Sequence, residues 1–397
     1  MSERDPSLDL DAVREAFAAS TDFTVGIEEE FALLDPDTLD LVDRFDELAA
    51  AAGEDPVLAD SVRGELIGSE IEIRSGRGES FAAAVDLQAE RRARLFSLAR
   101  RHRVALAATG THPWADYREQ RIIDTPHYRR LREQLAWVAQ RNNTWSLHVH
   151  VGVRDADRAI VVCDRLREHL PLLLAASANS PWLESRLSGL HSARSQLFTR
   201  SFPRCGIHDP FSDWATYADF VAMLERTDSI VGSTQIWWSV RPHHAFGTVE
   251  VRICDAQTSG AEATALSGLI VATVAQVALD YDERRPVPLR PGREIEENLW
   301  RAIRYGMSGR LIDFDRGEEI EARAALERHL DWCEPAREQL GIDPELPQLN
   351  GAERTYEVAD GETIEPGEAV DPARLYRHYE RSVAETARTY SPEAVRP

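Results

Sequence analysis

Three consecutive glutamates, Glu28 to Glu30, interrupt an apolar run near the start of the chain, TVGIEEEFALL. Adjacent carboxylates repel one another, and burying even one of them is costly unless a cation compensates its charge. If the run is a strand, its side chains alternate between two faces, so Glu28 and Glu30 share one face and Glu29 falls among the apolar residues of the other. Two carboxylates on one face can bind the same cation, although an edge strand with a solvated acidic face explains the pattern equally well. A buried Glu29 on the apolar face must pair with an arginine, unless a bulge or a different strand register turns it to the other face.

Three further segments show the same division into an apolar face and an ionisable face. GELIGSEIEIRSG, WSLHVHVGV and GTVEVRICD carry ionisable side chains at alternate positions, namely Glu70, Glu72 and Arg74, then His148 and His150, then Glu250 and Arg252. Each segment alone has a simpler explanation: an exposed acidic face, a histidine pair bonded to the backbone, or a cross-strand row of ion pairs. Because all four segments have one apolar face and one ionisable face, we expect them to form a single sheet on which at least five carboxylates converge.

Such a sheet face needs cations, and the composition limits which ones are available. The chain contains no lysine, which excludes a Walker A phosphate loop, a kinase-type ATP lysine, a Schiff-base lysine and a lysine-bridged dimetal centre. Without lysine, arginine and divalent metal are the remaining sources of positive charge, and oxygen ligands with one or two imidazoles suit Mg²⁺ or Mn²⁺ better than Zn²⁺. Mg²⁺ usually serves nucleotide phosphates. Arg241 and Arg252, on adjoining predicted strands, are placed to steady a phosphoryl group or a substrate carboxylate.

Charge and cysteine content narrow the class of protein. The net charge of −22 argues against non-specific binding to nucleic acid or to an anionic membrane. The four cysteines are far apart and lack zinc spacing, which is typical of reduced thiols in the cytosol. The N-terminus lacks the apolar core of a signal peptide, and the longest apolar stretch, Ala265–Leu279, is too short to span a bilayer comfortably. We therefore expect a cytoplasmic protein that acts on small molecules; a homodimer through the apolar stretch is compatible with the sequence.

The order of the predicted elements indicates the fold class. Strands cluster as hairpins, with long helices between or after them, which favours an α+β fold with an antiparallel sheet in one domain over residues 1–397. We expect a hairpin of 23–34 with 39–42 and a single helix over 155–178. Three more local predictions concern the second half of the chain: an irregular functional loop over 181–213, a helix over 317–339 and a polar connector over 348–366.

Six segments together resemble a known family. VGIEEEFALLDPDT, GELIGSEIEI, LHVHVGV, ANSPW, WWSVRPHHAFGTVEVRICDAQT and ENLWRAIRYG occur in the family's order between Val25 and Gly306. They are similar to the ATP-dependent carboxylate–amine ligase family, also called glutamate–cysteine ligase type 2. The resemblance implies a glutamine-synthetase-like fold, in which a curved antiparallel sheet flanked by helices forms a funnel that holds Mg²⁺ and ATP. It also implies that ATP phosphorylates a carboxylate, such as the γ-carboxylate of glutamate, and that an amine, such as that of cysteine, displaces phosphate to form an amide, with ADP and phosphate released.

The resemblance also assigns roles to residues. The implied metal ligands are Glu28, Glu30, Glu65, Glu72, His150 and Glu250; the implied catalytic residues are Arg241, Arg252 and Glu250. The implied nucleotide-binding residues are His148, His150 and Arg252; the implied substrate-binding residues are Ser192, Arg194 and Arg241. The family pattern points to Glu65 where strand alternation points to Glu70, and only a bulge or bend in ELIGSE lets both face the site. WLESRLSGLHSARSQLF departs from the family's aromatic-Trp-x-Gly signature and its following Thr-Gly, so the resemblance leaves the acid and amine open.

Two other functions are compatible with these patterns. A metal-dependent hydrolase could use His148 and His150 with carboxylates around Zn²⁺, and His243 or His244 would offer the further imidazole that it needs. A non-catalytic relative would keep the sheet and bind nucleotide without turning it over. Phosphate release that depends on ATP distinguishes the ligase from both.

Overall fold

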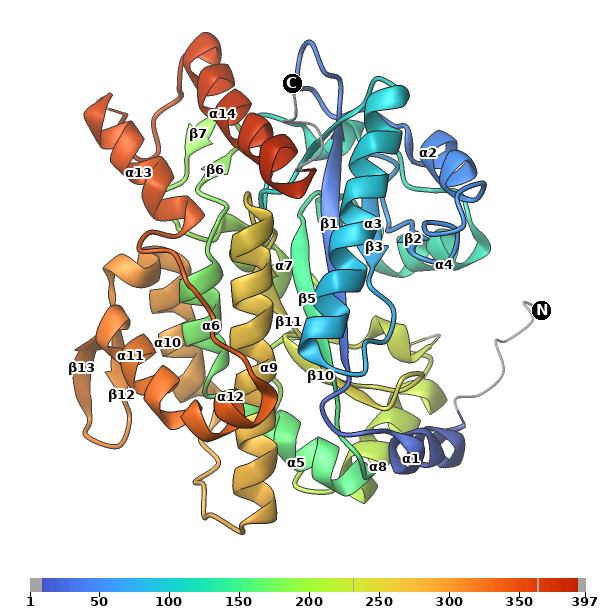
Figure 1. The fold of residues 1–397 in the computed structure, drawn as a ribbon, viewed down its shortest axis with the longest axis vertical. Coiled ribbons are helices and arrows are strands. Elements are labelled where there is room, and N and C mark those ends of the chain that lie inside the picture. The colour runs from blue at the N-terminus through green and yellow to red at the C-terminus, as the bar shows by residue number, and fades with distance from the viewer. Residues whose placement is uncertain (1–8, 231, 363, 392–397) are drawn as a thin grey trace.

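An open antiparallel sheet forms the centre of the molecule (Figure 1). A computed structural model describes residues 9–230, 232–362 and 364–391. The sheet has seven strands in the order β10-β11-β5-β1-β3-β2, with β4 paired to β1. Their bounds are β1 (Val25–Leu34), β2 (Val62–Arg63), β3 (Glu70–Arg74), β4 (Ala105–Ala107), β5 (Ser146–Gly152), β10 (Val240–His243) and β11 (Thr248–Asp255). The predicted α+β class with an antiparallel sheet is confirmed, whereas the extent of one catalytic domain over 1–397 stays a prediction.

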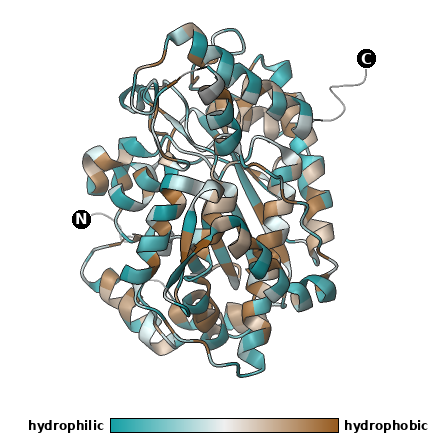
Figure 2. Cartoon of the chain, turned by 90° about the vertical axis from the view of Figure 1, so that its left-hand side faces the viewer, coloured by the Kyte–Doolittle hydropathy of each residue, from teal (hydrophilic) through white to brown (hydrophobic). Residues whose placement is uncertain are grey.

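Helices cover one face of this sheet. In Figure 1, α3 (Phe81–Arg101) and α9 (Gly260–Asp282) lie across it, with α3 against β1 and α9 against β5. Helix α9 is long and apolar enough to cross a membrane, but 83% of its most apolar window is buried inside the protein. It is therefore a core helix. Figure 2 shows hydrophobic residues gathered in the interior elements and hydrophilic residues over much of the outer helix surface.

The helix-covered face of β1 carries the core and one buried charge. Phe31 packs edge-on against the rings of Phe96 and Tyr390, at centroid distances of 5.4 and 5.3 Å. Glu29 points to this same face, where Nε and Nη2 of Arg92 donate to its carboxylate at 2.6 and 2.7 Å. Strict alternation therefore holds along β1, and Arg92 of α3 is the arginine partner that the sequence requires.

The other elements surround the sheet. The remaining α-helices are α1 (Leu10–Ala19), α2 (Phe45–Ala52), α4 (Pro126–Leu135), α5 (Ala156–Leu166), α6 (Leu170–Ser177), α7 (Ala193–Ser201), α8 (Trp214–Arg226), α10 (Gly292–Tyr305), α11 (Ala322–Trp332), α12 (Glu334–Leu340), α13 (Gly351–Gly361) and α14 (Pro372–Tyr390). Short 3-10 helices are η1 (Tyr117–Glu119), η2 (Ala136–Arg141), η3 (Ser233–Gln235) and η4 (Gly306–Ser308). Three strand pairs lie outside the sheet: β6 (Trp182–Leu183) with β7 (Arg186–Leu187), β8 (Cys205–Gly206) with β9 (Trp237–Trp238), and β12 (Arg310–Asp313) with β13 (Glu318–Glu321). The four cysteines, Cys163, Cys205, Cys254 and Cys333, are free thiols.

Two predicted segments contain more structure than their composition suggests. Residues 181–213, predicted to be irregular, contain β6, β7, α7 and β8; the Oγ of Ser192 caps α7 by accepting from the backbone N of Ser195 at 3.1 Å. The predicted polar connector 348–366 contains α13. A reciprocal capping box begins that helix, since the Asn350 side chain accepts from the Glu353 backbone at 2.9 Å and Glu353 accepts in return at 3.0 Å.

Three other local predictions are wrong. The helix predicted over 155–178 divides into α5 and α6, because Pro171 lies in the first turn of α6 and cannot donate a backbone hydrogen bond to a preceding turn. The helix predicted over 317–339 begins instead with β13, which pairs with β12. The hairpin of 23–34 with 39–42 reduces to a single bridge between Leu34 and Leu41, while β1 takes β3, β4 and β5 as its ladder partners.

Candidate active site

The face of the sheet opposite α3 and α9 lines a cavity of about 520 Å³. Six glutamates line this cavity: Glu28, Glu30, Glu65, Glu70, Glu72 and Glu250. Five of them are buried and Glu65 is half-buried. The expected convergence of at least five carboxylates on one sheet face is therefore confirmed.

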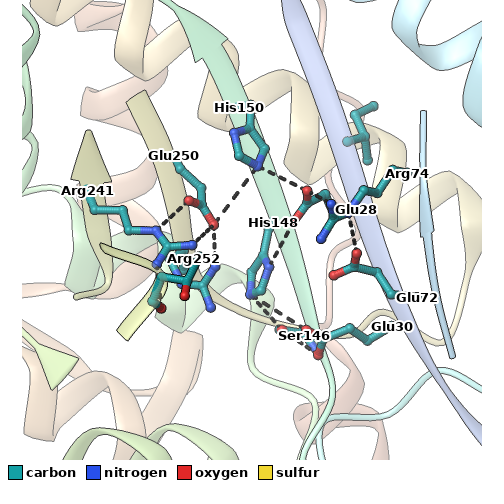
Figure 3. A network of polar contacts seen from close by, with 12 residues as sticks. Glu28, Glu30, Glu72, Arg74, Ser146, His148, His150, Arg241, Glu250 and Arg252 are labelled. Carbon is teal, nitrogen blue, oxygen red and sulfur yellow. Dashed lines mark hydrogen bonds and ion pairs between the residues drawn. The ribbon is translucent and has the colours of Figure 1, made fainter. Parts of the chain in front are cut away.

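Strand register explains why these side chains meet. Glu28 of β1 lies opposite both His148 of β5 and Arg74 of β3, and Glu30 lies opposite Glu72 (Figure 3). On the other side of β5, His150 lies opposite Glu250. Side chains at alternate positions of a strand share a face. Strands β3, β1, β5 and β11, which are distant in sequence, therefore present one continuous polar surface.

One group on this surface has the geometry of a cation site. Ligand atoms of Glu28, His150 and Glu250 all lie within 4.8 Å of one another. The Nε2 of His150 is 3.3 Å from Glu28 Oε1, is buried and lacks a hydrogen-bond partner among the described residues. Its Nδ1 lies 3.0 Å from the Oγ1 of Thr248, a contact that fixes the ring and leaves Nε2 free to act as a ligand.

A second group shares Glu28 with the first. Ligand atoms of Glu28, Glu72 and His148 also lie within 4.8 Å of one another. The Nδ1 of His148 is 3.5 Å from Glu28 Oε2, and its Nε2 is 2.7 Å from the Oγ of Ser146. The backbone N and Oγ of Ser146 in turn donate to Glu30 at 2.5 and 2.6 Å. Glu28 therefore lies between two candidate cation sites.

Arginines border the glutamates on both sides. Arg241 Nε donates to Glu250 at 2.6 Å and its Nη1 donates to the carbonyl of Ile236 at 2.7 Å, while Arg252 donates to the other oxygen of Glu250. Arg194 also lines the cavity and donates to the carbonyls of Ile253 and Arg252 at 3.0 and 3.2 Å. The Nε atoms of Arg194 and Arg252 are buried without a hydrogen-bond partner among the described residues. Both guanidinium groups thus keep donor capacity for an anion.

Electrostatics divides the glutamates into two classes. Burial raises the pKa of Glu70 and Glu72 well above the ordinary value, with further increases from neighbouring carboxylates, and raises that of Glu65 to about 7. Burial also raises the pKa of Glu28 and Glu250, but neighbouring positive groups outweigh this effect. His150, His148 and Arg74 together hold the pKa of Glu28 well below its usual range, and Arg241 and Arg252 do so for Glu250. In the first class the environment favours the protonated form, and a bound cation would favour the ionised form instead.

A bend between β2 and β3 allows both Glu65 and Glu70 to face the cavity, and which of them binds metal stays a prediction. Strand β2 ends at Arg63 and β3 begins at Glu70, and the backbone N of Gly68 donates to the carbonyl of Arg121 at 2.9 Å in the turn between them. This turn brings both Glu65 and Glu70 to the cavity. The Oε2 of Glu70 is buried without a partner among the described residues.

His244 and Ser192 lie outside the cavity lining, whereas His243 is part of it. Ser192 is buried away from the cavity lining, and its Oγ donates to Asp255 at 2.9 Å, so it anchors the helix that carries Arg194. The Nε2 of His244 lies 2.6 Å from the Tyr217 hydroxyl, outside the cavity, whereas His243 lines it. Burial lowers the pKa of His243 to about 3.

Sequence reasoning missed Phe246 and Trp237 in the cavity's aromatic lining, whereas Phe198 and Phe202 lie in the segment 181–213 that was expected to be functional. Phe246 lies in the turn between β10 and β11, and Phe198, Phe202 and Trp237 lie at the other end near Arg194. These residues follow no strand alternation that could have marked them. For Trp237, the aromatic content of its segment was the only signal.

Comparison with known proteins places the chain among ligases. The model of the glutamate–cysteine ligase family 2 matches residues 24–361. A protein of Rubrobacter xylanophilus with the name "Putative glutamate--cysteine ligase 2-2" is 42% identical over 306 residues, which are 77% of this chain and 78% of that protein. A "Putative glutamate--cysteine ligase 2" of Sorangium cellulosum is 39% identical over 82% of this chain and 87% of its own length.

Two solved structures share the fold. A glutamate–cysteine ligase of Francisella tularensis in complex with AMP aligns with a TM-score of 0.60 at 13% identity, over 94% of this chain and 99% of its own. A bifunctional glutathione synthetase of Pasteurella multocida aligns with a TM-score of 0.58 at 14% identity, over 97% of this chain and 54% of its own. At these identities the likeness concerns the fold alone.

Proposed function

Because the chain belongs to glutamate–cysteine ligase family 2, we propose that it is an ATP-dependent ligase that activates a carboxylate as an acyl phosphate and joins it to an amine. The reaction forms an amide and releases ADP and phosphate, and glutamate with cysteine is the first substrate pair to test. Family membership confirms the resemblance seen in the motifs. The observation that carries the proposal is the gathering of six carboxylates, with His148, Arg241 and Arg252, around one cavity.

The chemistry explains why such a site is needed. A carboxylate is a poor acylating agent because oxide is a very poor leaving group, and phosphorylation replaces it with phosphate. Bringing the γ-phosphate of ATP to a carboxylate means overcoming repulsion between anions, so positioning and electrostatic stabilisation dominate the catalysis. A site for this reaction must therefore collect positive charge in fixed positions.

The donor set fits Mg²⁺ or Mn²⁺. Carboxylate oxygens with an imidazole are ligands that these ions accept, and the unpartnered Nε2 of His150 and Oε2 of Glu70 are buried atoms that a ligand would satisfy. Residues that would hold such ions are Glu28, Glu30, Glu65, Glu72, His150 and Glu250, with His148 beside them. When bound, divalent cations supply screening of phosphate charge and stabilise the transferring phosphoryl group.

The arginines bind and orient the anions. Arg252 and Arg194 each present a buried Nε without a partner, and their fixed guanidinium groups suit a phosphate oxygen or a substrate carboxylate. Arg241 holds Glu250 in place with two hydrogen bonds. Because these groups are already ordered, they stabilise developing charge without reorganisation.

The hydrolase alternative is less well supported by the geometry. Among the described residues, the candidate cation group that contains His148 does not contain His150, and each group is otherwise made of carboxylates. A zinc site built on the two histidines would need both imidazoles on one ion.

Product analysis tests the proposal directly. Purified protein is incubated with Mg-ATP, glutamate and a pool of amines, and phosphate release is measured together with mass spectrometry of new amides. We expect one phosphate per amide and no amide without ATP. Amine-independent hydrolysis of an amide substrate without ATP would instead support the hydrolase, and tight ATP binding without turnover would support the non-catalytic relative.

A further inference from the structure

An exposed aromatic ring stands at one end of the candidate active site. Phe246 lines the cavity, yet 54% of its surface is exposed. A large apolar side chain gains free energy when it is buried, so one held open at a polar cavity points to a ligand that covers it.

The ring is part of a stack that begins at a candidate cation site. Phe246 lies nearly parallel to His243, with ring centroids 4.4 Å apart and planes 13° apart. His243 in turn meets His150 edge-on at 4.9 Å, and His150 belongs to the group with Glu28 and Glu250. One face of the Phe246 ring is thus covered by His243, and its exposed part lies on the side away from that histidine.

The turn that carries Phe246 is rigid. Gly247 has a φ of +60°, and its backbone N donates to the carbonyl of His243 at 3.1 Å. The Oγ of Ser20, at the end of α1, donates to the Gly247 carbonyl at 2.7 Å. A side chain at position 247 would come within 2.6 Å of the Ala16 carbonyl, so the turn is packed against α1. The backbone that carries the ring is therefore held in place, and His243 stacks on the ring itself, which together lower the entropy cost of binding.

The cavity has two chemically different ends. His150 lies opposite Gly26 of β1 and Glu70 lies opposite Ala32, so the two ends are separated by six residues of strand, about 20 Å along the sheet. Phe246 belongs to the His150 end, where it is 5.7 Å from that ring. Arg194 belongs to the Glu70 end. A nucleoside triphosphate also has two chemically different ends, a flat aromatic base at one and a charged phosphate chain at the other.

We propose that Phe246 is the platform on which the adenine of ATP stacks, so that the nucleotide enters over the turn between β10 and β11 and the acid and amine occupy the Glu70 end. This inference rests on the proposed ATP-dependent reaction and adds the orientation of the nucleotide. Stacking on an aromatic face suits a nucleobase because every base has a π-face. The base lies beyond the ring, and the phosphates extend from it toward Glu28, His150 and Glu250.

Binding measurements separate the base from the phosphates. Titration calorimetry compares Mg-ATP with Mg-tripolyphosphate, which has the phosphate chain and no base, on wild type, Phe246→Ala and Phe246→Trp. Trp137→Ala is the matched control, because Trp137 is 53% exposed and does not line this cavity. We expect Phe246→Ala to weaken Mg-ATP about tenfold while leaving tripolyphosphate unchanged. Phe246→Trp restores ATP affinity, Trp137→Ala leaves both affinities at the wild-type value, and KM for ATP rises in Phe246→Ala with little change in kcat.

Each other result overturns the inference in a recognisable way. Equal Mg-ATP affinity in wild type and Phe246→Ala refutes the stacking platform and leaves the ligase proposal intact. Equal weakening of ATP and tripolyphosphate shows that Phe246 acts only through His243 on the charged site. A wild-type protein that binds neither ligand refutes both the proposed function and this inference.

Discussion

Glu29 and Glu30 are neighbours in sequence whose replacement should have opposite consequences. Glu29 is buried under α3. Arg92 donates two hydrogen bonds to its carboxylate, at 2.6 and 2.7 Å, and Gln88 donates a third at 2.7 Å. In Glu29→Gln, the remaining amide oxygen can still accept from Arg92, whose other contacts are those of 3.3 Å to Gly260 and Thr264 and the Tyr390 ring at 5.0 Å. None of these carries a negative charge.

The expected cost follows from the loss of one partner of a buried ion pair. An uncompensated buried charge costs about 3–5 kcal/mol, which is a large part of the roughly 5–15 kcal/mol that stabilises a typical protein. Glu30 has no such role, because it points into the cavity and accepts hydrogen bonds from Ser146. Its charge raises the pKa of both Glu65 and Glu70. Glu30→Gln therefore relieves repulsion in the metal-free protein and should leave stability equal or slightly higher.

Urea denaturation followed by tryptophan fluorescence distinguishes the two variants, with ATP-dependent phosphate release measured on the same preparations. We expect Glu29→Gln to lower the midpoint strongly, and Glu30→Gln to keep the midpoint and lose turnover. The double variant Glu29→Leu with Arg92→Met removes both charges and should recover most of the lost stability. A wild-type midpoint in Glu29→Gln, or a double variant less stable than the single one, would refute the reasoning.

Three further predictions concern the site and acid stability. Glu250→Gln should reduce ATP-dependent phosphate release by at least about 100-fold. Its urea midpoint should fall, because Arg241 loses a buried carboxylate partner, but the circular dichroism spectrum should keep its shape, because Arg241 retains the carbonyls of Thr234 and Ile236 and Arg252 retains attraction to Glu28 and Glu30; wild-type turnover would contradict the assignment. Since the pKa of Glu65 is raised to about 7, Mg²⁺ binding should release protons and tighten as pH rises from 6 to 8, which calorimetry in buffers of different ionisation enthalpy detects. Burial lowers the pKa of His112 to about 4, and its Nδ1 accepts from the backbone N atoms of Trp114 and Ala115. Protonation therefore favours the unfolded chain, and up to about 3 kcal/mol of stability is lost as pH falls from 6.5 toward 4; a His112→Gln variant should show a smaller pH dependence of its urea midpoint.

Strand geometry explains which parts of the site were predictable. The period of two is a property of any strand, so Glu28 with Glu30 and His148 with His150 could be placed on common faces without knowing the strand order. The same rule required a partner for Glu29, which the structure supplies as Arg92.

Features that depend on turns and tertiary contacts were not predictable in this way. The bend that brings Glu65 beside Glu70 depends on a hydrogen bond to Arg121, more than fifty residues away. Helix α13 depends on the capping box at Asn350, which polar composition conceals. Ser192 carries a family motif yet serves as a helix cap, because a serine hydroxyl fits a cap as well as a ligand.

The absence of lysine has a consequence for the charge of the site. Two arginines beside the cavity are each held by more than one hydrogen bond: Arg241 by Glu250 and the carbonyl of Ile236, and Arg194 by two backbone carbonyls. A guanidinium fixed in this way cannot swing onto Glu30, Glu65 or Glu70. A lysine ammonium on its flexible stem could do so and would neutralise these carboxylates directly. The site thus keeps an excess of negative charge that only protons or added cations can balance, which is the condition that a divalent-metal site for ATP requires.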